Sequence, residues 1–208
     1  MGASDTNNLT GIHAGEDIYI LGSGATMDFY DPKFFDGRVT IGLNLIYKFI
    51  PVTYVHTHHH EIVQEAINEG ANVITSKHHI CHPAHDEHNF TGDYYFYHHK
   101  HQLFCDADVN GLDENPLIIA GTPVVGAMHI AYKMGARAIF LCGVDGGTID
   151  GKMNYSKYPV PTQAGHPTRV DGVIKKLADQ IRASGVPVCY LLPFTTLRLD
   201  GHEYSSIC

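Results

Sequence analysis

Three residues in one polar segment could carry acid–base chemistry. His166 stands just before a helical pattern, and Tyr155 and Tyr158 precede it in the same segment. A neutral imidazole near pH 7 can accept a proton from a hydroxyl group, and phenol hydroxyls can donate hydrogen bonds to a developing phosphate charge without a metal. Taken by themselves, however, these residue types favour the simpler interpretation of three exposed loop residues.

Glycines and an asparagine stand where two strand-like runs end. Gly22, Ser23 and Gly24 close the first run. Glycines there let a ligand approach the backbone closely, and the N–H groups that follow can bind an anion. Asn44 closes the second run, and its amide offers two donors and one acceptor to a nucleobase, a ribose or a phosphate. A tight turn and a turn asparagine are the alternatives.

Two further candidates lie at a helix start and at a strand end. Gly121, Thr122 and Pro123 open a helical pattern, with unpaired N–H groups and a hydroxyl that a nucleotide could use. Thr122 is equally well explained as an ordinary N-cap before a proline at the first helical position. Asp145 ends an apolar run and could hold a ribose, a metal or an acceptor hydroxyl, or could cap the next turn.

The sixteen histidines are an unusual feature of the composition. The spacing of Cys81, His85 and His88 could bring three ligands around a transition metal. The chain has no His-Glu-x-x-His and no Cys-x-x-Cys motif. Adjacent residues such as His58–His60 cannot share one face of a helix. We therefore expect most histidines to face solvent, to belong to a lid or to contact substrate.

Strand-like runs and helical patterns alternate along the chain. Such alternation predicts parallel strands joined by right-handed crossovers, an α/β, Rossmann-like, mostly parallel sheet flanked by helices. Ligands bind such sheets at the carboxyl ends of the strands, where the candidates above stand. Helices are predicted over residues 59–70, from Pro123 to Met134, and from an N-cap at Thr168 to a stop at Gly185. The predicted strands are 17–24, 38–44, 52–57, 71–75, 117–120, 136–145 and 186–193.

The length of the chain suits a single domain over residues 1–208. Residues 76–115 interrupt the alternation and are predicted to form a His-rich lid or insertion within that domain, with a short strand at Tyr94–Tyr97. Residues 1–16 are expected to form a loose arm.

The charge and the cysteines limit partners and compartment. A net charge of −8 disfavours binding to nucleic acid polymers. The chain contains no run of about 18 apolar residues, so no membrane span is expected. The polar start of the chain does not resemble a secretory signal. Cys142 and Cys189 lie in apolar runs and are expected to be buried free thiols. These features predict a cytoplasmic protein.

Several motifs occur in one order over roughly residues 17–195. ILGSGATM is followed by GLNLIY, which carries Asn44, and by a block from Gly121 to Asp145. NYSKY, AGHPT and CYLLP come next. In this order and spacing the chain resembles the bacterial sialyltransferases of glycosyltransferase family 42.

The resemblance implies an inverting transferase that moves a sugar from a CMP-activated or other nucleotide-sugar donor to a hydroxyl of a glycan or other small acceptor. His166 would be the general base, and Tyr155 and Tyr158 would stabilise the departing phosphate. No metal or other cofactor would be required. The expected nucleotide contacts are Gly22, Ser23, Gly24, Asn44, Gly121, Thr122 and Asp145.

Two other interpretations stay open. The chain also resembles Rossmann-like proteins of the DUF115 type, which include pyrophosphokinases that use ATP and Mg²⁺; Asp145 and Asp150 could serve such chemistry. Alternatively, the chain is a non-catalytic, histidine-rich module that binds a metal or a nucleotide, because a fold does not prove an activity. Homo-oligomerisation is also left open by the sequence.

Overall fold

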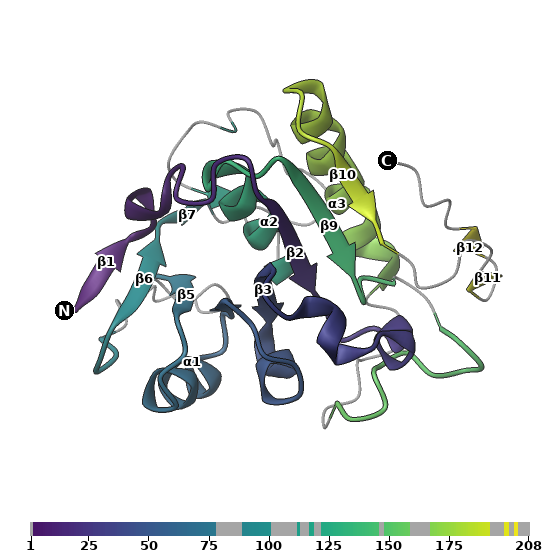
Figure 1. Ribbon diagram of the computed structural model, residues 1–208, viewed down its shortest axis with the longest axis horizontal. Coiled ribbons are helices and arrows are strands. Elements are labelled where there is room, and N and C mark those ends of the chain that lie inside the picture. The colour runs from purple at the N-terminus through teal and green to yellow at the C-terminus, as the bar shows by residue number, and fades with distance from the viewer. Residues whose placement is uncertain are drawn as a thin grey trace.

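Eight parallel strands form one twisted sheet at the centre of the computed structural model (Figure 1). The structure describes residues 2–77, 89–100, 112, 117–118, 122–145, 148–158, 167–191, 198–199 and 202–203. Across the sheet the strands are β1 (Ala3–Asp5), β6 (Tyr94–Tyr97), β5 (Val73–Ser76), β4 (Tyr54–His56), β3 (Val39–Leu43), β2 (Asp17–Leu21), β9 (Ala138–Cys142) and β10 (Val188–Tyr190). The predicted α/β, Rossmann-like fold is confirmed.

The strand order reverses at β2. From β2 the chain adds β3, β4, β5 and β6 on one side, and it then returns to add β9 and β10 on the other side. Because all these pairs are parallel, the carboxyl ends of the strands lie along one edge of the sheet. The reversal between β2 and β9 is the place where such sheets hold their ligands.

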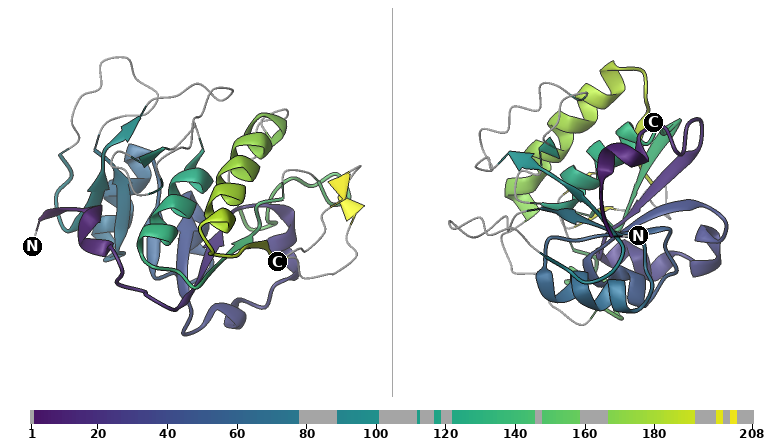
Figure 2. Two further views of the ribbon diagram at one scale, coloured as in Figure 1. Left: turned by 90° about the horizontal axis from the view of Figure 1, so that it is seen from above. Right: turned by 90° about the vertical axis from the view of Figure 1, so that its left-hand side faces the viewer.

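Helices cover both faces of the sheet (Figure 2). α2 (Pro123–Lys133) and α3 (Pro167–Ala183) pack on one face, against Ile18 and Ile20 of β2. The opposite face carries α1 (His60–Asn68) and the short 3₁₀ helices η2 (Ala25–Phe29), η3 (Pro32–Phe35) and η4 (Asn44–Lys48). Tyr19 and Leu21 point to that face, as expected for alternate residues of a strand buried on both sides.

The helix boundaries follow local chemistry. Thr122 caps α2 by accepting a hydrogen bond from the Val124 N–H, and Pro123 occupies the first turn, as predicted. Gly135 ends this helix with a positive φ of 84°. The predicted cap of α3 was wrong, because the helix begins at Pro167 and already includes Thr168.

Residues 2–16 do not form the loose arm that was predicted. β1 is the edge strand of the sheet beside β6, and the 3₁₀ helix η1 (Thr6–Leu9) follows it. Leu9 is buried, and the backbone N–H groups of Gly11 and His13 donate to carbonyls at the end of α2. The polar composition concealed these backbone contacts, since they need no apolar side chain.

The predicted strand at Tyr94–Tyr97 is confirmed as β6, and it lies inside the main sheet between β5 and β1. Part of the predicted strand 117–120 pairs elsewhere: β8 (Leu117–Ile118) and β7 (His99–Lys100) form a separate two-stranded sheet. β11 (Arg198–Leu199) and β12 (His202–Glu203) form another. The remainder of residues 76–115 lies largely outside the described residues, and its role as a lid stays a prediction.

The two cysteines expected to be free differ. Cys142 is a buried free thiol, and burial raises its pKa to about 12. Cys189 is disulfide-bonded, so the prediction of a free thiol there was wrong. Among the helices in the described part of the chain, none has the length and apolar character to cross a membrane.

Candidate functional site

A pocket of about 550 Å³ lies at the carboxyl edge of the sheet, where the strand order reverses. The residues that follow β2, β3 and β9 form one part of its wall, and the first turns of α1 and α2 form another. Its lining residues are Gly22, Ser23, Leu43, Asn44, Leu45, His59, Glu61, Ile62, Thr122, Pro123, Val124, Gly143, Val144 and Tyr158. Five predicted site residues, Gly22, Ser23, Asn44, Thr122 and Tyr158, therefore meet in one cavity.

The glycine turn after β2 packs tightly on the end of β9. The Gly22 N–H donates to the Cys142 carbonyl over 2.7 Å, and the Gly24 N–H donates to the Gly143 carbonyl over 2.8 Å. A Cβ atom on Gly22 would lie 2.4 Å from the Gly143 carbonyl oxygen. These two glycines thus allow close contact between two backbones, and their N–H groups are already engaged.

Asn44 is the centre of the polar wall. It is one of two non-glycine residues with positive φ in the described chain, at 52°, a conformation that asparagine tolerates better than most residues. Its Oδ1 accepts a hydrogen bond of 2.9 Å from the Thr57 hydroxyl. Asn44 begins η4 directly after β3, and it lines the pocket.

Tyr158 closes the wall from the 148–158 segment. Burial raises the pKa of its phenol, and hydrogen bonds from the Leu45 backbone, Ser23 and Asn44 act in the opposite direction. Ser23, which follows β2, and Asn44 and Leu45, which follow β3, line the same pocket as Tyr158.

Tyr155 has a different environment. Its side chain is buried in the core beside Phe49, with ring centroids 6.1 Å apart. Its backbone N–H donates to the Ser23 carbonyl over 2.7 Å, which attaches the segment to the glycine turn. Tyr155 is not among the residues that line the pocket, and its predicted catalytic role stays a prediction.

Asp145 is buried behind the glycine turn. Its carboxylate accepts hydrogen bonds from both the backbone N–H and the hydroxyl of Thr26. Burial raises the pKa of this carboxyl, while the Thr26 contacts act in the opposite direction. The carboxylate thus binds the first turn of η2, whereas the predicted alternative was a cap for the turn after Asp145. The predicted nucleotide contact of Asp145 stays untested.

The start of α1 brings two residues to the pocket that the strand-end rule did not select. His59 precedes the helix and Glu61 lies in its first turn; the His59 Nδ1 and Glu61 Oε1 atoms are 3.8 Å apart. Both side chains are largely exposed. The available signal was their position one turn beyond β4, at the same edge as Asn44.

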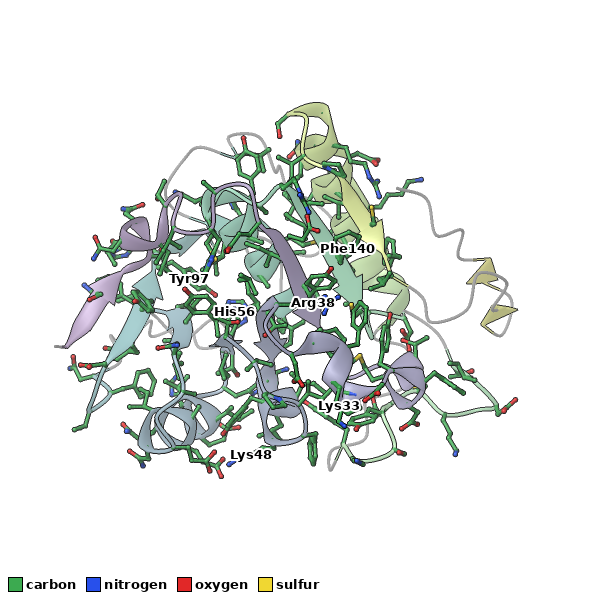
Figure 3. All side chains as sticks on the ribbon, viewed as in Figure 1. Lys33, Arg38, Lys48, His56, Tyr97 and Phe140 are labelled. Carbon is green, nitrogen blue, oxygen red and sulfur yellow. The ribbon has the colours of Figure 1, made fainter. Side chains whose placement is uncertain are left out.

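A second polar cluster lies beside this wall, within the interior of the domain (Figure 3). The Tyr97 hydroxyl lies 2.8 Å from Nε2 of His56 and 2.6 Å from Nε2 of His58. His56 is fully buried, and burial lowers its pKa to about 3. The imidazole of His56 is therefore neutral throughout the physiological pH range.

Other candidates fall outside the described residues. These are the proposed base His166, the helix-start residue Gly121, and the weak metal candidates Cys81, His85 and His88. In the part of the chain that the structure describes, no three histidine, cysteine, aspartate or glutamate side chains are grouped to hold a metal ion.

Comparisons with known proteins identify a structural relative. No protein-family model and no curated protein matches the sequence. The solved structure of the MAf glycosyltransferase from Magnetospirillum magneticum AMB-1 matches with a TM-score of 0.54 and 16% sequence identity over 94% of this chain. The match spans 38% of that larger protein. At this identity the likeness shows a shared fold.

Proposed function

We propose that this chain is a sialyltransferase-like glycosyltransferase domain that moves a sugar from a CMP-activated or other nucleotide-sugar donor to an acceptor hydroxyl, with inversion. The fold shared with a glycosyltransferase supports the class of reaction. The position of the pocket at the strand reversal supports a nucleotide as its ligand. The acceptor would be a glycan or another small molecule.

The polar wall of the pocket at the strand reversal is the observation that carries this proposal. Ser23, Asn44 and Thr122 line the pocket together with Tyr158 and offer hydroxyl and amide groups to a ligand. A phosphate presents acceptor oxygens and negative charge, so it suits the same donors and the N-terminal end of α2. The apolar side chains Leu43 and Ile62 complete the wall for a less polar part of the ligand.

The proposed chemistry uses the chain's own residues. Tyr158 donates a hydrogen bond to the departing phosphate, and Ser23 and Asn44 hold its oxygens. His166 accepts the proton of the acceptor hydroxyl as the new glycosidic bond forms and the bond from sugar to phosphate breaks. In this scheme the tyrosine hydroxyl replaces the charge stabilisation that a metal provides in other transferases.

The carboxylates favour a transferase over an ATP–Mg²⁺ pyrophosphokinase. Proteins that bind Mg²⁺ with a nucleoside triphosphate place carboxylates near the phosphates. In the described wall of the pocket Glu61 is the single carboxylate. Asp145 is held by Thr26, and Asp150 lies on an exposed turn.

A thermal-shift panel of CMP, CDP, UDP, GDP, ATP with Mg²⁺, and Zn²⁺ tests the ligand class. A ligand at 100 times its Kd stabilises a protein by about 2.7 kcal/mol. We expect a selective shift with CMP or CDP, followed by hydrolysis of a CMP-activated sugar. A shift with ATP and Mg²⁺ alone would replace the proposal with the pyrophosphokinase. A shift with Zn²⁺ alone would favour the histidine-rich binding module.

Two variants test the assigned roles. Asn44→Gly retains the positive-φ backbone and removes the amide, so we expect CMP affinity to fall by about thirtyfold, or about 2 kcal/mol. Asn72→Ala is the matched control, because the Asn72 amide donates to the Thr53 carbonyl at the other edge of the sheet. His166→Ala should abolish transfer and leave CMP affinity within a few fold, since a base acts in the transition state. Unchanged turnover would remove His166 from the mechanism.

A further inference from the structure

Thr57 is a fully buried hydroxyl residue directly after β4 that lies behind the pocket wall. Its Oγ1 atom lies 2.9 Å from Oδ1 of Asn44 and 3.2 Å from the backbone nitrogen of His59. Thr57 does not itself line the pocket. It connects the end of β4 to the end of β3 through the side chain of Asn44.

The proton count at Thr57 fixes the direction of these two hydrogen bonds. A threonine hydroxyl has one proton and two acceptor positions. The His59 N–H can act only as a donor, so Oγ1 accepts from it. The buried hydroxyl proton then needs an acceptor, and Asn44 Oδ1 is the acceptor that the described residues provide. A reversed amide would leave the Thr57 proton without a partner.

This direction has a consequence for the other end of the amide. With Oδ1 turned to Thr57, the Nδ2 group of Asn44 lies on the other side of the amide, and Asn44 lines the pocket together with Tyr158. The positive φ of Asn44 also fixes where the side chain leaves the backbone. Backbone and hydroxyl together therefore restrict the amide to one orientation.

We infer that Thr57 is a positioning residue that orients the Asn44 amide, so that the pocket presents an N–H donor and selects ligands by an acceptor oxygen such as that of a phosphate or a carbonyl. The inference deepens the proposed function and rests on it for the identity of the ligand. The orientation of Asn44 itself follows from the unliganded protein and can be measured without any ligand.

Three variants separate this role from a loss of stability. Thr57→Val removes the hydroxyl at constant shape, and Thr57→Ser restores it. Thr40→Val is the matched control, since Thr40 is also buried and hydrogen-bonded, to Thr53, but at the amino-terminal edge of the sheet. By titration calorimetry we expect CMP affinity to fall by about tenfold in Thr57→Val and to stay within about twofold in the other two variants.

Asn44→Asp is a second test that does not depend on the folding of Thr57→Val. It keeps an oxygen for the Thr57 hydroxyl and replaces the pocket-facing donor by an acceptor. We expect this variant to remain folded and to lose CMP binding. Unchanged CMP affinity in either Thr57→Val or Asn44→Asp would overturn the inference.

NMR of the ligand-free protein distinguishes failure of this inference from failure of the proposed function. The side-chain amide signals of Asn44, assigned by their absence in Asn44→Gly, should shift in Thr57→Val and return to their original position in Thr57→Ser. If these signals behave as expected and no nucleotide binds, the orientation stands and the proposed function fails. If they do not move in Thr57→Val, Thr57 does not orient Asn44.

Discussion

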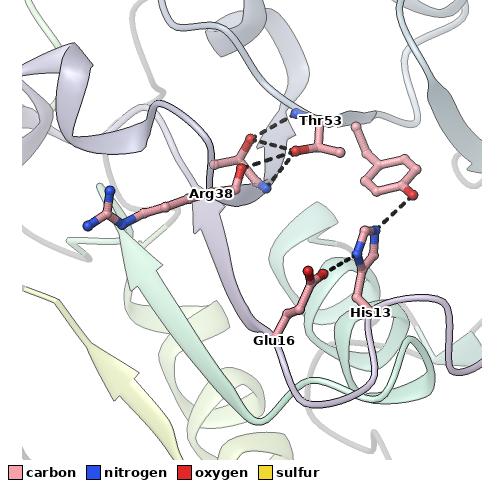
Figure 4. Close-up of polar contacts among 6 residues, drawn as sticks. His13, Glu16, Arg38 and Thr53 are labelled. Atoms are coloured by element: carbon pink, nitrogen blue, oxygen red, sulfur yellow. Dashed lines mark hydrogen bonds and ion pairs between the residues drawn. The ribbon is translucent and has the colours of Figure 1, made fainter.

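The two ends of β3 and β4 carry similar side chains arranged for different purposes. At the amino-terminal edge, the Thr40 and Thr53 N–H groups each donate to the hydroxyl of the other residue, over 3.0 and 2.8 Å (Figure 4). The Thr53 hydroxyl also donates to the Arg38 carbonyl over 3.3 Å. At the carboxyl edge, the Thr57 hydroxyl donates to the Asn44 amide oxygen, and Asn44 lines the pocket together with Tyr158. Both networks border a cavity, but the N–H groups of Thr40 and Thr53 are used within the first network, whereas the second ends in the Asn44 amide at the pocket.

The glycines of the two edges show the same contrast. Gly15 and Gly37, before β2 and β3, have positive φ angles and open space around the position of a Cβ atom. Gly22 and Gly24, after β2, have ordinary φ angles. A Cβ atom added to either residue would lie closer to the Gly143 carbonyl oxygen than van der Waals contact allows. Turn geometry thus requires glycine at one edge, and close packing of backbones requires it at the other.

The largest expected effect follows from this packing. In Gly22→Ala the added methyl group would overlap the Gly143 carbonyl oxygen, and a backbone atom cannot move aside as a side chain can. We expect a loss of about 3 kcal/mol in the free energy of unfolding, measured by urea denaturation. Gly172→Ala in α3 is the control, because nothing surrounds that position; it should gain about 0.5 kcal/mol. Equal effects of the two changes would refute the packing argument.

The second expected effect separates the two tyrosines of the 148–158 segment. Tyr158→Phe removes the only polar atom that this side chain brings to the pocket wall, so we expect CMP affinity to fall by about thirtyfold, or about 2 kcal/mol. Tyr155→Phe should leave affinity and turnover unchanged, because that ring lies in the core. Calorimetry and donor hydrolysis measure both variants. A larger loss in Tyr155→Phe would place the leaving-group role on the buried ring.

The third prediction concerns the pH dependence of stability. The pKa of folded His56 is about 3, against about 6.5 in an unfolded chain. Below pH 6.5 the unfolded state binds a proton that the folded state cannot, so stability is lost as the pH falls. At pH 5.5 the loss relative to pH 7.5 is about 1.4 kcal/mol.

Urea denaturation at the two pH values measures this loss. It should decrease by that amount in His56→Gln and persist in His59→Gln, since the His59 side chain is largely exposed. The comparison between variants isolates the contribution of His56 to the pH dependence from that of the other fifteen histidines. An unchanged pH dependence in His56→Gln would mean that the buried imidazole accepts a proton in the folded state.

The strand ends were predictable from the sequence because they depend on local patterns. A buried parallel strand is a continuous apolar run, and the residue that ends the run lies at the ligand-binding edge wherever its neighbours are. This reasoning placed Gly22 and Asn44 at the edge where the pocket lies, whereas Thr122 lines the pocket as the N-cap of α2; their nucleotide contacts stay predictions. It needed the direction of the strands and no knowledge of how the side chains pack.

The remaining features depend on contacts between segments far apart in the chain. Tyr155 and Tyr158 are equivalent in sequence, and only the attachment of Tyr155 to Ser23 makes one a core residue and the other a pocket residue. Asp145 follows β9, which ends at Cys142 and not at Asp145 as predicted, and Thr26, far away in sequence, donates hydrogen bonds to its carboxylate. Composition likewise could not reveal that the polar residues 3–5 form an edge strand.

The smallest expected effect tests whether the two edges are independent. Arg137 forms a bidentate ion pair with Asp17 at the amino-terminal edge, with N···O distances of 2.9 and 2.8 Å, and its guanidinium lowers the pKa of that carboxyl. The arginine is exposed, so solvent and salt screen the pair. We expect Arg137→Gln to lower stability slightly at low ionic strength, and to differ less from the wild type in about 0.5 M salt, where the Debye length is short. CMP affinity should not change, because no residue of this pair lines the pocket. A change in affinity would show that the β2–β9 pair transmits strain from one edge to the other, and the functional separation of the two edges would then be wrong.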